Sequence, residues 1–475
     1  MNITYLELGI QQYTIKALQE LEMNETLNQH ASMHMTALLY DEQQDSDIYN
    51  TEAGSQIKLE QKGEKVLFQG VVKKIIVERK QGVYWLSIDA VSNTYLLDIK
   101  KSSQSFQNVN MSYIDMIKKV LEPYQGSDVI DNVTEGKTIE HFIMQYMETD
   151  WTFIKRVASH FQAAIVPYCL SDKPKFTIGM PRGENIGDLS KYHYRIEKNI
   201  EQYLKSSQND NQGLQELDTV LFYIETNQNF NIGDSASFQN ITLYIKQKKA
   251  RIQQNVLVYE YVLSSENSFT QDKLYHEGIV GLSLKGKVLE VVEDCVKVQL
   301  EIDAEETKKE QAYPFPYTTT YTAEGNSGWY CMPEVDDTVM IYFPTKEEKY
   351  GVGVNSLRVL ERGSDKISDP EVKYFRTKNG KELKFSPEEI LITCCNGTDE
   401  QTGEEHIIYI RLHQNSGVEI TSTEPILLKS DDNIELQAKE QIFFAAKEEI
   451  LFKCKTSQIT VNEMVDVAAK EVRLN

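Results

Sequence analysis

The C-terminal part of the chain repeats a pattern of apolar and polar positions every eight residues. In each unit two apolar residues stand two positions apart, and charged or small residues separate one unit from the next. Because alternate side chains of a β-strand lie on the same face, each apolar pair would share one side of a short strand. The clearest pairs are Ile434 and Leu436, Ile442 and Phe444, Ile450 and Phe452, and Ile459 and Val461.

This short period is difficult to satisfy within one chain. Hairpins at such spacing favour glycine-containing turns, yet no glycine follows Gly417. Eight extended residues span only about 26 Å, whereas single-chain solenoids use repeats of about 20 residues or more. We therefore predict that three chains intertwine into a triangular β-prism, with the apolar pairs on its axis and Glu440 and Glu448 facing solvent. An antiparallel sheet within one chain is the alternative.

The first part of the chain alternates short strands with two predicted helices. Strands are expected at residues 65–77, 84–90 and 142–146. Ser112 followed by Asp115 is typical of a helix N-terminus, and an apolar stripe follows it. A second helix follows Glu148, Thr149 and Asp150, which are expected to cap its N-terminus.

A chain of 475 residues is too long for one compact core, so several domains are expected. We predict a mainly β, multidomain fold that begins with an α+β part. Its parts are a first domain with two helices at 1–185, a second, mostly β domain at 186–278, an OB-type barrel at 279–360, a linker at 361–373 and the β-prism at 374–475. The barrel prediction rests on short strands with long loops, and such a barrel alone does not identify a function.

The charge and the cysteines exclude some classes of protein. With 72 acidic and 50 basic residues the net charge is −22, which argues against nucleic acid as a partner. No apolar run approaches the roughly 20 residues of a membrane-spanning helix, and the N-terminus does not read as a signal peptide. The six cysteines form no CxxC motif and are predicted to be reduced thiols in a protein made in the cytoplasm.

No set of residues forms a recognisable catalytic, cofactor or metal motif. Glu148 and Asp150 could act as paired carboxylates, but acidic side chains at a helix N-terminus also stabilise its free N–H groups, which is the interpretation we favour. His406 and His413 would face opposite sides of a strand, and a metal ion on a threefold axis stays open for them. We predict no catalytic residue, no cofactor and no metal ligand.

Several segments resemble the VgrG-type family of spike proteins, in the correct order along the chain. The first is residues 142–161, here called the hub motif. It includes Gln145, Tyr146, Glu148, Thr149, Asp150, Trp151, Phe153, Ile154, Arg156 and Val157. LFQGVV at 67–72 and SFQNVNMSYIDMIKKVL at 105–121 resemble two further hub segments. The sequence at 328–343 and the C-terminal repeats resemble the central barrel and the needle of that family.

The resemblance implies a homotrimeric central spike of a contractile injection machine, such as a type VI secretion system, a phage tail or a phage-tail-like particle. In that family two tube-like hub domains, here 1–185 and 186–278, dock on a hexameric inner tube protein among baseplate proteins. The barrel forms a collar, and the prism forms the needle. Val472 and Leu474 would leave an apolar tip that binds a PAAR-type protein. The spike would be assembled in the cytoplasm and ejected with effector cargo, with transient contact to a target membrane.

Two other functions stay open at this point. A cell-wall hydrolase on a trimeric stalk would need an additional domain with an acid–base pair of carboxylates, for which we find no room. A trimeric receptor-binding fibre would share the β-prism but would lack a hub such as residues 1–275.

Overall fold

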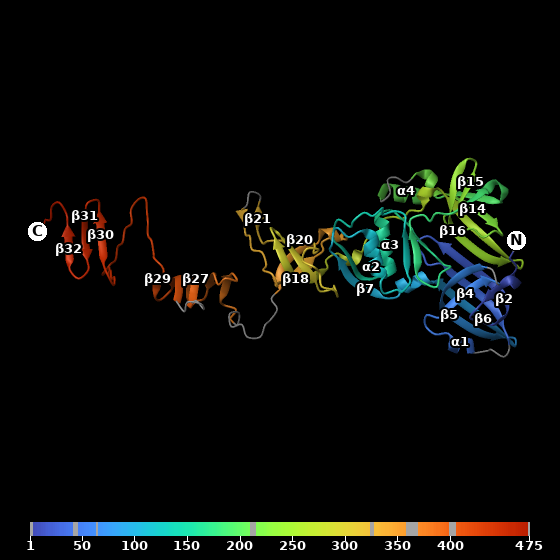
Figure 1. The fold of residues 1–475 in the computed structure, drawn as a ribbon, viewed down its shortest axis with the longest axis horizontal. Coiled ribbons are helices and arrows are strands. Elements are labelled where there is room, and N and C mark those ends of the chain that lie inside the picture. The colour runs from blue at the N-terminus through green and yellow to red at the C-terminus, as the bar shows by residue number, and fades with distance from the viewer. Residues whose placement is uncertain are drawn as a thin grey trace. The chain divides into compact units, whose positions relative to one another are not determined.

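The structure of the chain is a computed structural model. It describes residues 3–40, 46–62, 65–209, 215–323, 327–357, 369–398 and 405–473. The chain divides into two compact units, unit 1 (Met1–Val359) and unit 2 (Leu360–Asn475). The elements of both units are labelled in Figure 1, and the described residues are mainly in β-strands.

The largest element of unit 1 is a twelve-stranded sheet. Its main path runs through β1 (Leu8–Ile10), β4 (Gln56–Gln61), β5 (Lys65–Lys80), β6 (Val83–Ser92), β3 (Ser32–Leu39), β2 (Ile15–Thr26), β16 (Ile241–Gln253), β17 (Val256–Ser264), β14 (Val220–Thr226) and β13 (Tyr194–Lys198). Off this path, β15 (Ser235–Phe238) pairs with β16 and with β12 (Asn185–Asp188). The predicted pair of strands at 65–77 and 84–90 is confirmed as β5 and β6.

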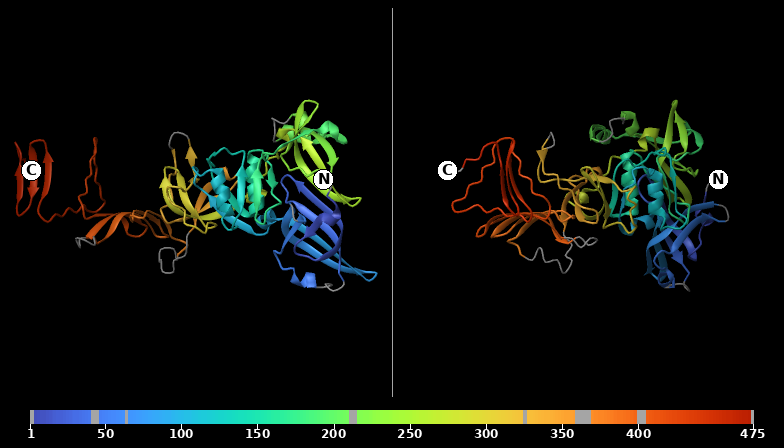
Figure 2. Two further views of the ribbon diagram at one scale, coloured as in Figure 1. Left: turned by 45° about the vertical axis from the view of Figure 1, so that its right-hand side comes forward. Right: turned by 60° about the vertical axis from the view of Figure 1, so that its left-hand side comes forward.

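One antiparallel pairing joins the early strands of this sheet to the late ones. Residues 22–26 of β2 pair with residues 247–251 of β16, and Figure 2 shows the blue and green strands that these elements belong to. Alternate residues of β3 are buried, including Met33, Met35 and Ala37, as expected for a strand with one face on a core. A single apolar core therefore includes side chains from both groups of strands.

The helical part of unit 1 has a core of its own. It contains α2 (Tyr113–Leu121), α3 (Asp150–His160), the paired strands β7 (Lys101–Phe106) and β9 (Ile143–Thr149), and a sheet of β8 (Asp128–Asp131), β11 (Lys175–Ile178) and β10 (Ile165–Pro167). The Ser112 cap is confirmed, because the Ser112 hydroxyl oxygen accepts a hydrogen bond from the Asp115 N–H at 3.1 Å. Two helices were not predicted, α1 (Ser46–Asn50) and α4 (Ile200–Asn209).

The last part of unit 1 is a five-stranded antiparallel sheet around a third core. Its order is β20 (Pro314–Pro316), β19 (Cys295–Leu300), β18 (Ser283–Val292), β23 (Thr338–Tyr342) and β24 (Val352–Leu357), and a small hairpin of β21 (Thr322–Ala323) and β22 (Ser327–Gly328) lies outside it. The two outer strands approach each other through a parallel bridge between Tyr317 and Gly353. A Cβ atom at Gly353 would lie only 2.9 Å from the Tyr317 ring, so this close approach requires glycine.

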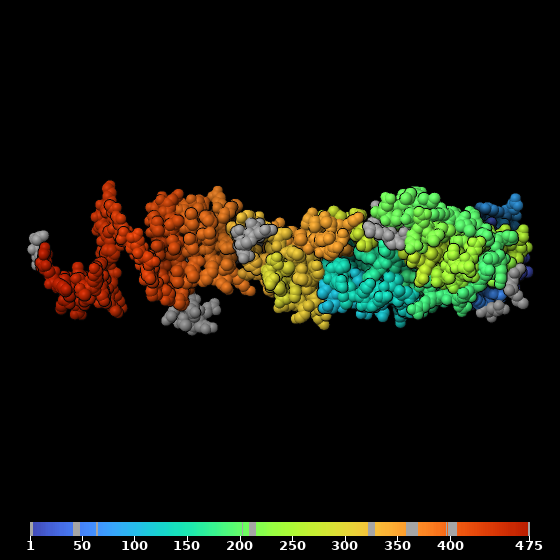
Figure 3. All heavy atoms as spheres, turned by 90° about the horizontal axis from the view of Figure 1, so that it is seen from above, coloured from blue at the N-terminus to red at the C-terminus, as the bar shows by residue number. Residues whose placement is uncertain are grey.

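Unit 2 consists of two antiparallel sheets joined by residues 423–449, which form no helix or strand. The first sheet contains β25 (Lys373–Arg376), β26 (Glu382–Phe385), β27 (Glu389–Thr398), β28 (Glu405–His413) and β29 (Gly417–Ser422) in sequential order. The second contains β30 (Ile450–Cys454), β31 (Ser457–Val461) and β32 (Val465–Ala468). Figure 3 shows the orange and red atoms of this unit, which include a thin run of chain with no second layer packed on it.

Candidate functional site

The first sheet of unit 2 carries one apolar face that nothing in the described chain covers. Cross-strand register places its members in continuous rows, for example Phe385, Ile390, Leu412 and Val418. The whole face contains Phe375, Leu383, Phe385, Ile390, Ile392, Ile410, Leu412, Val418 and Ile420. Eight of these nine residues are 37–71% exposed. A sheet that leaves a whole apolar face in water needs a partner for it.

The opposite face of the same sheet is polar and internally paired. Arg411 contacts Glu389 at 2.7 Å and Glu419 at 3.7 Å, and Lys384 contacts Glu389 at 3.0 Å. Hydrogen bonds from Lys384 and Arg411 lower the pKa of Glu389. The sheet is therefore amphipathic, with one polar face and one apolar face.

The apolar residues of the eight-residue repeat are also exposed along residues 423–449. The predicted axial residues Ile434, Leu436, Ile442 and Phe444 are 48–60% exposed in the single chain. The Phe444 ring contacts the Phe452 ring of the next repeat edge to face, with 6.2 Å between the ring centroids. Glu440 and Glu448, which are predicted to face solvent, are also exposed in the single chain.

The second sheet of unit 2 corrects the argument against hairpins. Strands β30, β31 and β32 pair antiparallel within one chain, at the spacing for which we expected no hairpin. The turn between β30 and β31 has no glycine, and Lys455 takes the left-handed conformation with φ +52° instead. Part of the alternative, an antiparallel sheet within one chain, is therefore present at residues 450–468.

The predicted pairs nevertheless share one face of this second sheet. Ile450 lies opposite Val461, and Phe452 lies opposite Ile459. Ile459 in turn lies opposite Val467. At the end of the described chain Val472 is 53% exposed, and Leu474 lies outside the described residues.

In unit 1 the hub motif forms a buried ionic network. The Arg156 guanidinium is 4% exposed and contacts Glu148 and Glu348 at 2.6 Å each. It also donates to the Met144 carbonyl oxygen at 2.8 Å. Burial opposes the charge of Arg156, but Glu348 and Glu148 outweigh it and raise the pKa of the guanidinium.

This network corrects the capping role predicted for the two acidic residues of the motif. The helix cap is Thr149, whose hydroxyl oxygen accepts from the Thr152 N–H at 3.2 Å. Glu148 binds Arg156 instead. Asp150 accepts hydrogen bonds from the Gln145 amide at 2.7 Å and from the Tyr124 hydroxyl at 2.6 Å. The Glu148 and Glu348 carboxylates therefore link the helical part of unit 1 to the segment around residue 348 through Arg156. The sequence did not reveal this network because Glu348 lies 192 positions from Arg156.

The aromatic residues of the motif fill two cores. Trp151 is 2% exposed and packs against His30 at 4.6 Å between ring centroids. Phe153 is fully buried and stacks on Phe106. Tyr146 packs on the third core, around the sheet that contains β18. The hub motif thus connects the helical part of unit 1 to the β18–β24 sheet.

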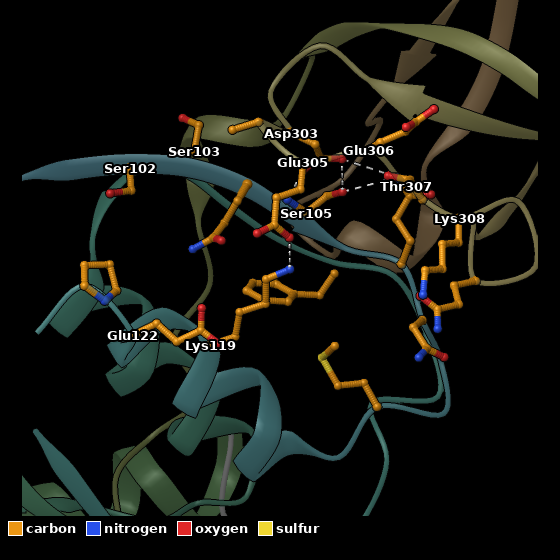
Figure 4. A pocket seen from close by; sticks show the side chains of 18 of the residues that line it. Ser102, Ser103, Ser105, Lys119, Glu122, Asp303, Glu305, Glu306, Thr307 and Lys308 are labelled. Atoms are coloured by element: carbon orange, nitrogen blue, oxygen red, sulfur yellow. Dashed lines mark hydrogen bonds and ion pairs between the residues drawn. The ribbon is translucent and has the colours of Figure 1, made fainter. Parts of the chain in front are cut away.

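A cavity of about 690 Å³ in unit 1 lies beside β7 and is lined by Lys119 of α2 and by residues 303–308. Figure 4 shows its polar side chains, with Lys119 and Glu305 paired across it at 2.7 Å. Within the described ranges no three His, Cys, Asp or Glu side chains are grouped so as to hold a metal ion. No helix among these residues is long and apolar enough to cross a membrane.

Comparison with known families supports the resemblance given by the motifs. The sequence profile of the phage tail baseplate hub family (GPD) matches residues 24–162, a range that contains all three hub segments. The chain has the fold of a VgrG-type spike protein. No curated protein sequence matches it.

Two solved structures illustrate this fold. One is an Escherichia coli component of the type VI secretion system that is structurally similar to the T4 bacteriophage tail proteins gp27 and gp5. It has a TM-score of 0.54 and 12% identity over 74% of this chain and 99% of its own. The other is the half-lidded Francisella PdpA–VgrG complex, with a TM-score of 0.54 and 12% identity over 85% of this chain and 83% of its own. At this identity the likeness concerns the fold alone.

Proposed function

We propose that the chain is the homotrimeric central spike of a contractile injection system. The observation that carries the proposal is the uncovered apolar face of unit 2, which extends from Phe375 to Val467 without one buried residue among those described. Three copies that bring these faces together would remove them from water, at about 25 cal/mol per Å² of apolar surface. The result would be the β-prism needle of residues 374–475.

The remaining parts have roles that suit this assembly. The two tube-like hub domains of each chain, at 1–185 and 186–278, would give six such domains in a trimer, and these would dock on a hexameric inner tube protein. The large sheet consists of early strands (β1 to β6) and late strands (β12 to β17) that meet through the pairing of β2 with β16, which supports this division. The β18–β24 sheet would be an OB-type barrel that forms the collar, in agreement with its parallel closing bridge.

The protein would act mechanically and without catalytic residues. Assembled in the cytoplasm among baseplate proteins, it would be ejected on contraction, cross the target membrane and deliver effector cargo. Val472 and Leu474 would bind a PAAR-type tip protein. Hydrolysis of peptidoglycan by the purified chain, lost on mutation of one carboxylate, would contradict this role.

The mass of the purified chain in solution tests the trimer. We expect three times the mass of one chain for the wild type. Ile450→Asp would place three carboxylates on the shared apolar face and should leave monomers. Leu451→Asp is the matched control, because Leu451 lies on the other face opposite Thr460 and is itself 49% exposed. A folded wild-type monomer, or equal loss of trimer in both variants, would contradict the proposal.

A further inference from the structure

Strand β7 has one edge without a strand beside it. It pairs with β9 in a two-stranded sheet, and no strand of the described chain pairs with its other edge. An open edge offers backbone N–H and C=O groups to an extended chain placed next to it. This outer edge is called the β7 edge below.

The β7 edge borders the cavity between α2 and residues 303–308. All six residues of β7 line this space of about 690 Å³, a volume within the usual range of ligand sites. Helix α2 and residues 303–308 form the facing walls, as Figure 4 shows. The cavity therefore lies where a third strand of this sheet would run.

One side chain already occupies part of that position. The Asp303 carboxylate accepts hydrogen bonds from the Ser105 N–H and from the Ser105 hydroxyl, both at 2.6 Å. Because the Ser105 N–H donates to Asp303, which lines the cavity, this N–H points away from β9 and into the cavity. Asp303 thus takes the place that a peptide carbonyl oxygen of an added strand would take. Burial raises the pKa of this carboxyl group.

The contact that crosses the cavity is weak enough to open. Lys119 of α2 and Glu305 are paired at 2.7 Å, but their side chains are 37% and 75% exposed. Exposed pairs of this kind contribute about 0–1 kcal/mol. An incoming chain could therefore displace this pair.

The lining offers hydroxyl groups and charges, beside apolar side chains such as Phe106 and Met111, to a chain placed along β7. Ser102, Ser103 and Thr307 contribute hydroxyl groups, while charges of both signs surround them. We propose that the β7 edge binds an extended segment of a partner protein, rich in small polar side chains, which adds to β7 as a third strand. Backbone hydrogen bonds would supply most of its affinity. This inference does not depend on the proposed function.

A capped eight-residue peptide of alternating threonine and serine is a direct probe for the full-length protein. The control is the same peptide with N-methyl groups on its four central amides, which lacks the backbone donors but keeps the side chains. We expect the first peptide to bind at least tenfold more tightly in an anisotropy titration. Hydrogen exchange should slow at residues 101–106 when it binds.

A pair of variants locates the site. Lys119→Ala removes the contact across the cavity and should tighten peptide binding several-fold. Lys118→Ala is the control, because Lys118 lies on the same helix and does not line the cavity. Equal affinity for both peptides, no binding at millimolar peptide, or no difference between the variants would overturn the proposal. Protection of residues 101–106 on trimer formation alone would also overturn it, in favour of a contact between copies.

Discussion

The two units of this chain bury their apolar residues in opposite ways. Unit 1 has three cores, with fully buried side chains such as Phe68, Phe153 and Phe315. The described residues of unit 2 include no buried side chain, although its sheets are as regular. Regular strands with alternating faces are therefore no sign that a region is stable alone. Unit 1 has the buried cores that a single chain needs, whereas unit 2 leaves its apolar faces exposed, and in the function that we propose other copies of the chain cover them.

The largest effect is expected where unit 1 buries charge. Arg156→Ala leaves Glu148 and Glu348 buried without their partner, which should lower the free energy of unfolding of unit 1 by about 3–5 kcal/mol. Denaturant unfolding of the full chain measures this loss. Replacing all three residues by Met or Leu should recover most of the stability, and a triple variant as unstable as Arg156→Ala would mean that the ion pairs are not the cause.

A pair of phenylalanine substitutions compares the two units directly. Phe315→Ala empties a fully buried site in unit 1 and should cost about 3–5 kcal/mol at any protein concentration. Phe452→Ala removes a half-exposed ring of unit 2 and should weaken only the association of chains. Unfolding measured at two protein concentrations separates the cases. An effect of Phe452→Ala that is independent of concentration would break the comparison.

Acid should weaken unit 1 through partly buried histidines, among them His141 and His160. Burial lowers the pKa of His141 and of His160 below the ordinary value of 6.5. The unfolded chain then binds protons more readily, so their contribution is complete above pH 6.5 and is lost as pH falls through the lower, folded-state values. Denaturant midpoints between pH 7.5 and 5 should fall, and His141→Gln with His160→Gln should reduce the slope. An unchanged slope would exclude these residues as the cause.

The smallest effect concerns one helix cap. Ser112→Ala removes the acceptor for the Asp115 N–H at the start of α2 and should cost about 1 kcal/mol. Ser112→Gly should cost only a few tenths of a kcal/mol. Thermal unfolding of unit 1 in the full chain is sensitive enough to rank the two. Equal losses would indicate that the cap contributes little here.

Local patterns predicted local structure well. Alternation placed the apolar pairs of β30 and β31 on one face, and the Ser112 signal placed α2. The β7 edge and its cavity were not predicted, because they depend on residues 303–308 lying beside β7 and α2, which are far from them in the sequence. Helix α4 was missed because its ten residues are rich in glutamine and serine and lie among polar loops.

Errors arose where a residue acts through a distant partner or an uncommon backbone conformation. Glu148 looked like a helix cap until Glu348 and Arg156 were placed beside it. A buried arginine on an apolar helix face needs an anion, and that requirement was a usable signal. Lys455 accepts a left-handed conformation that composition assigns to glycine, so the hairpin after β30 was not expected.

The pairing of β2 with β16 has a consequence for the order of folding during synthesis. Asn24 and Gln247, which meet across this pairing, are 223 positions apart in the chain. The edge of β2 that pairs with β16 therefore stays unpaired until most of unit 1 has left the ribosome. At about 5–20 residues per second, that delay is on the order of 10–50 seconds. During this time the nascent chain presents an unpaired strand edge, and a chaperone that covers it would raise the yield of folded protein.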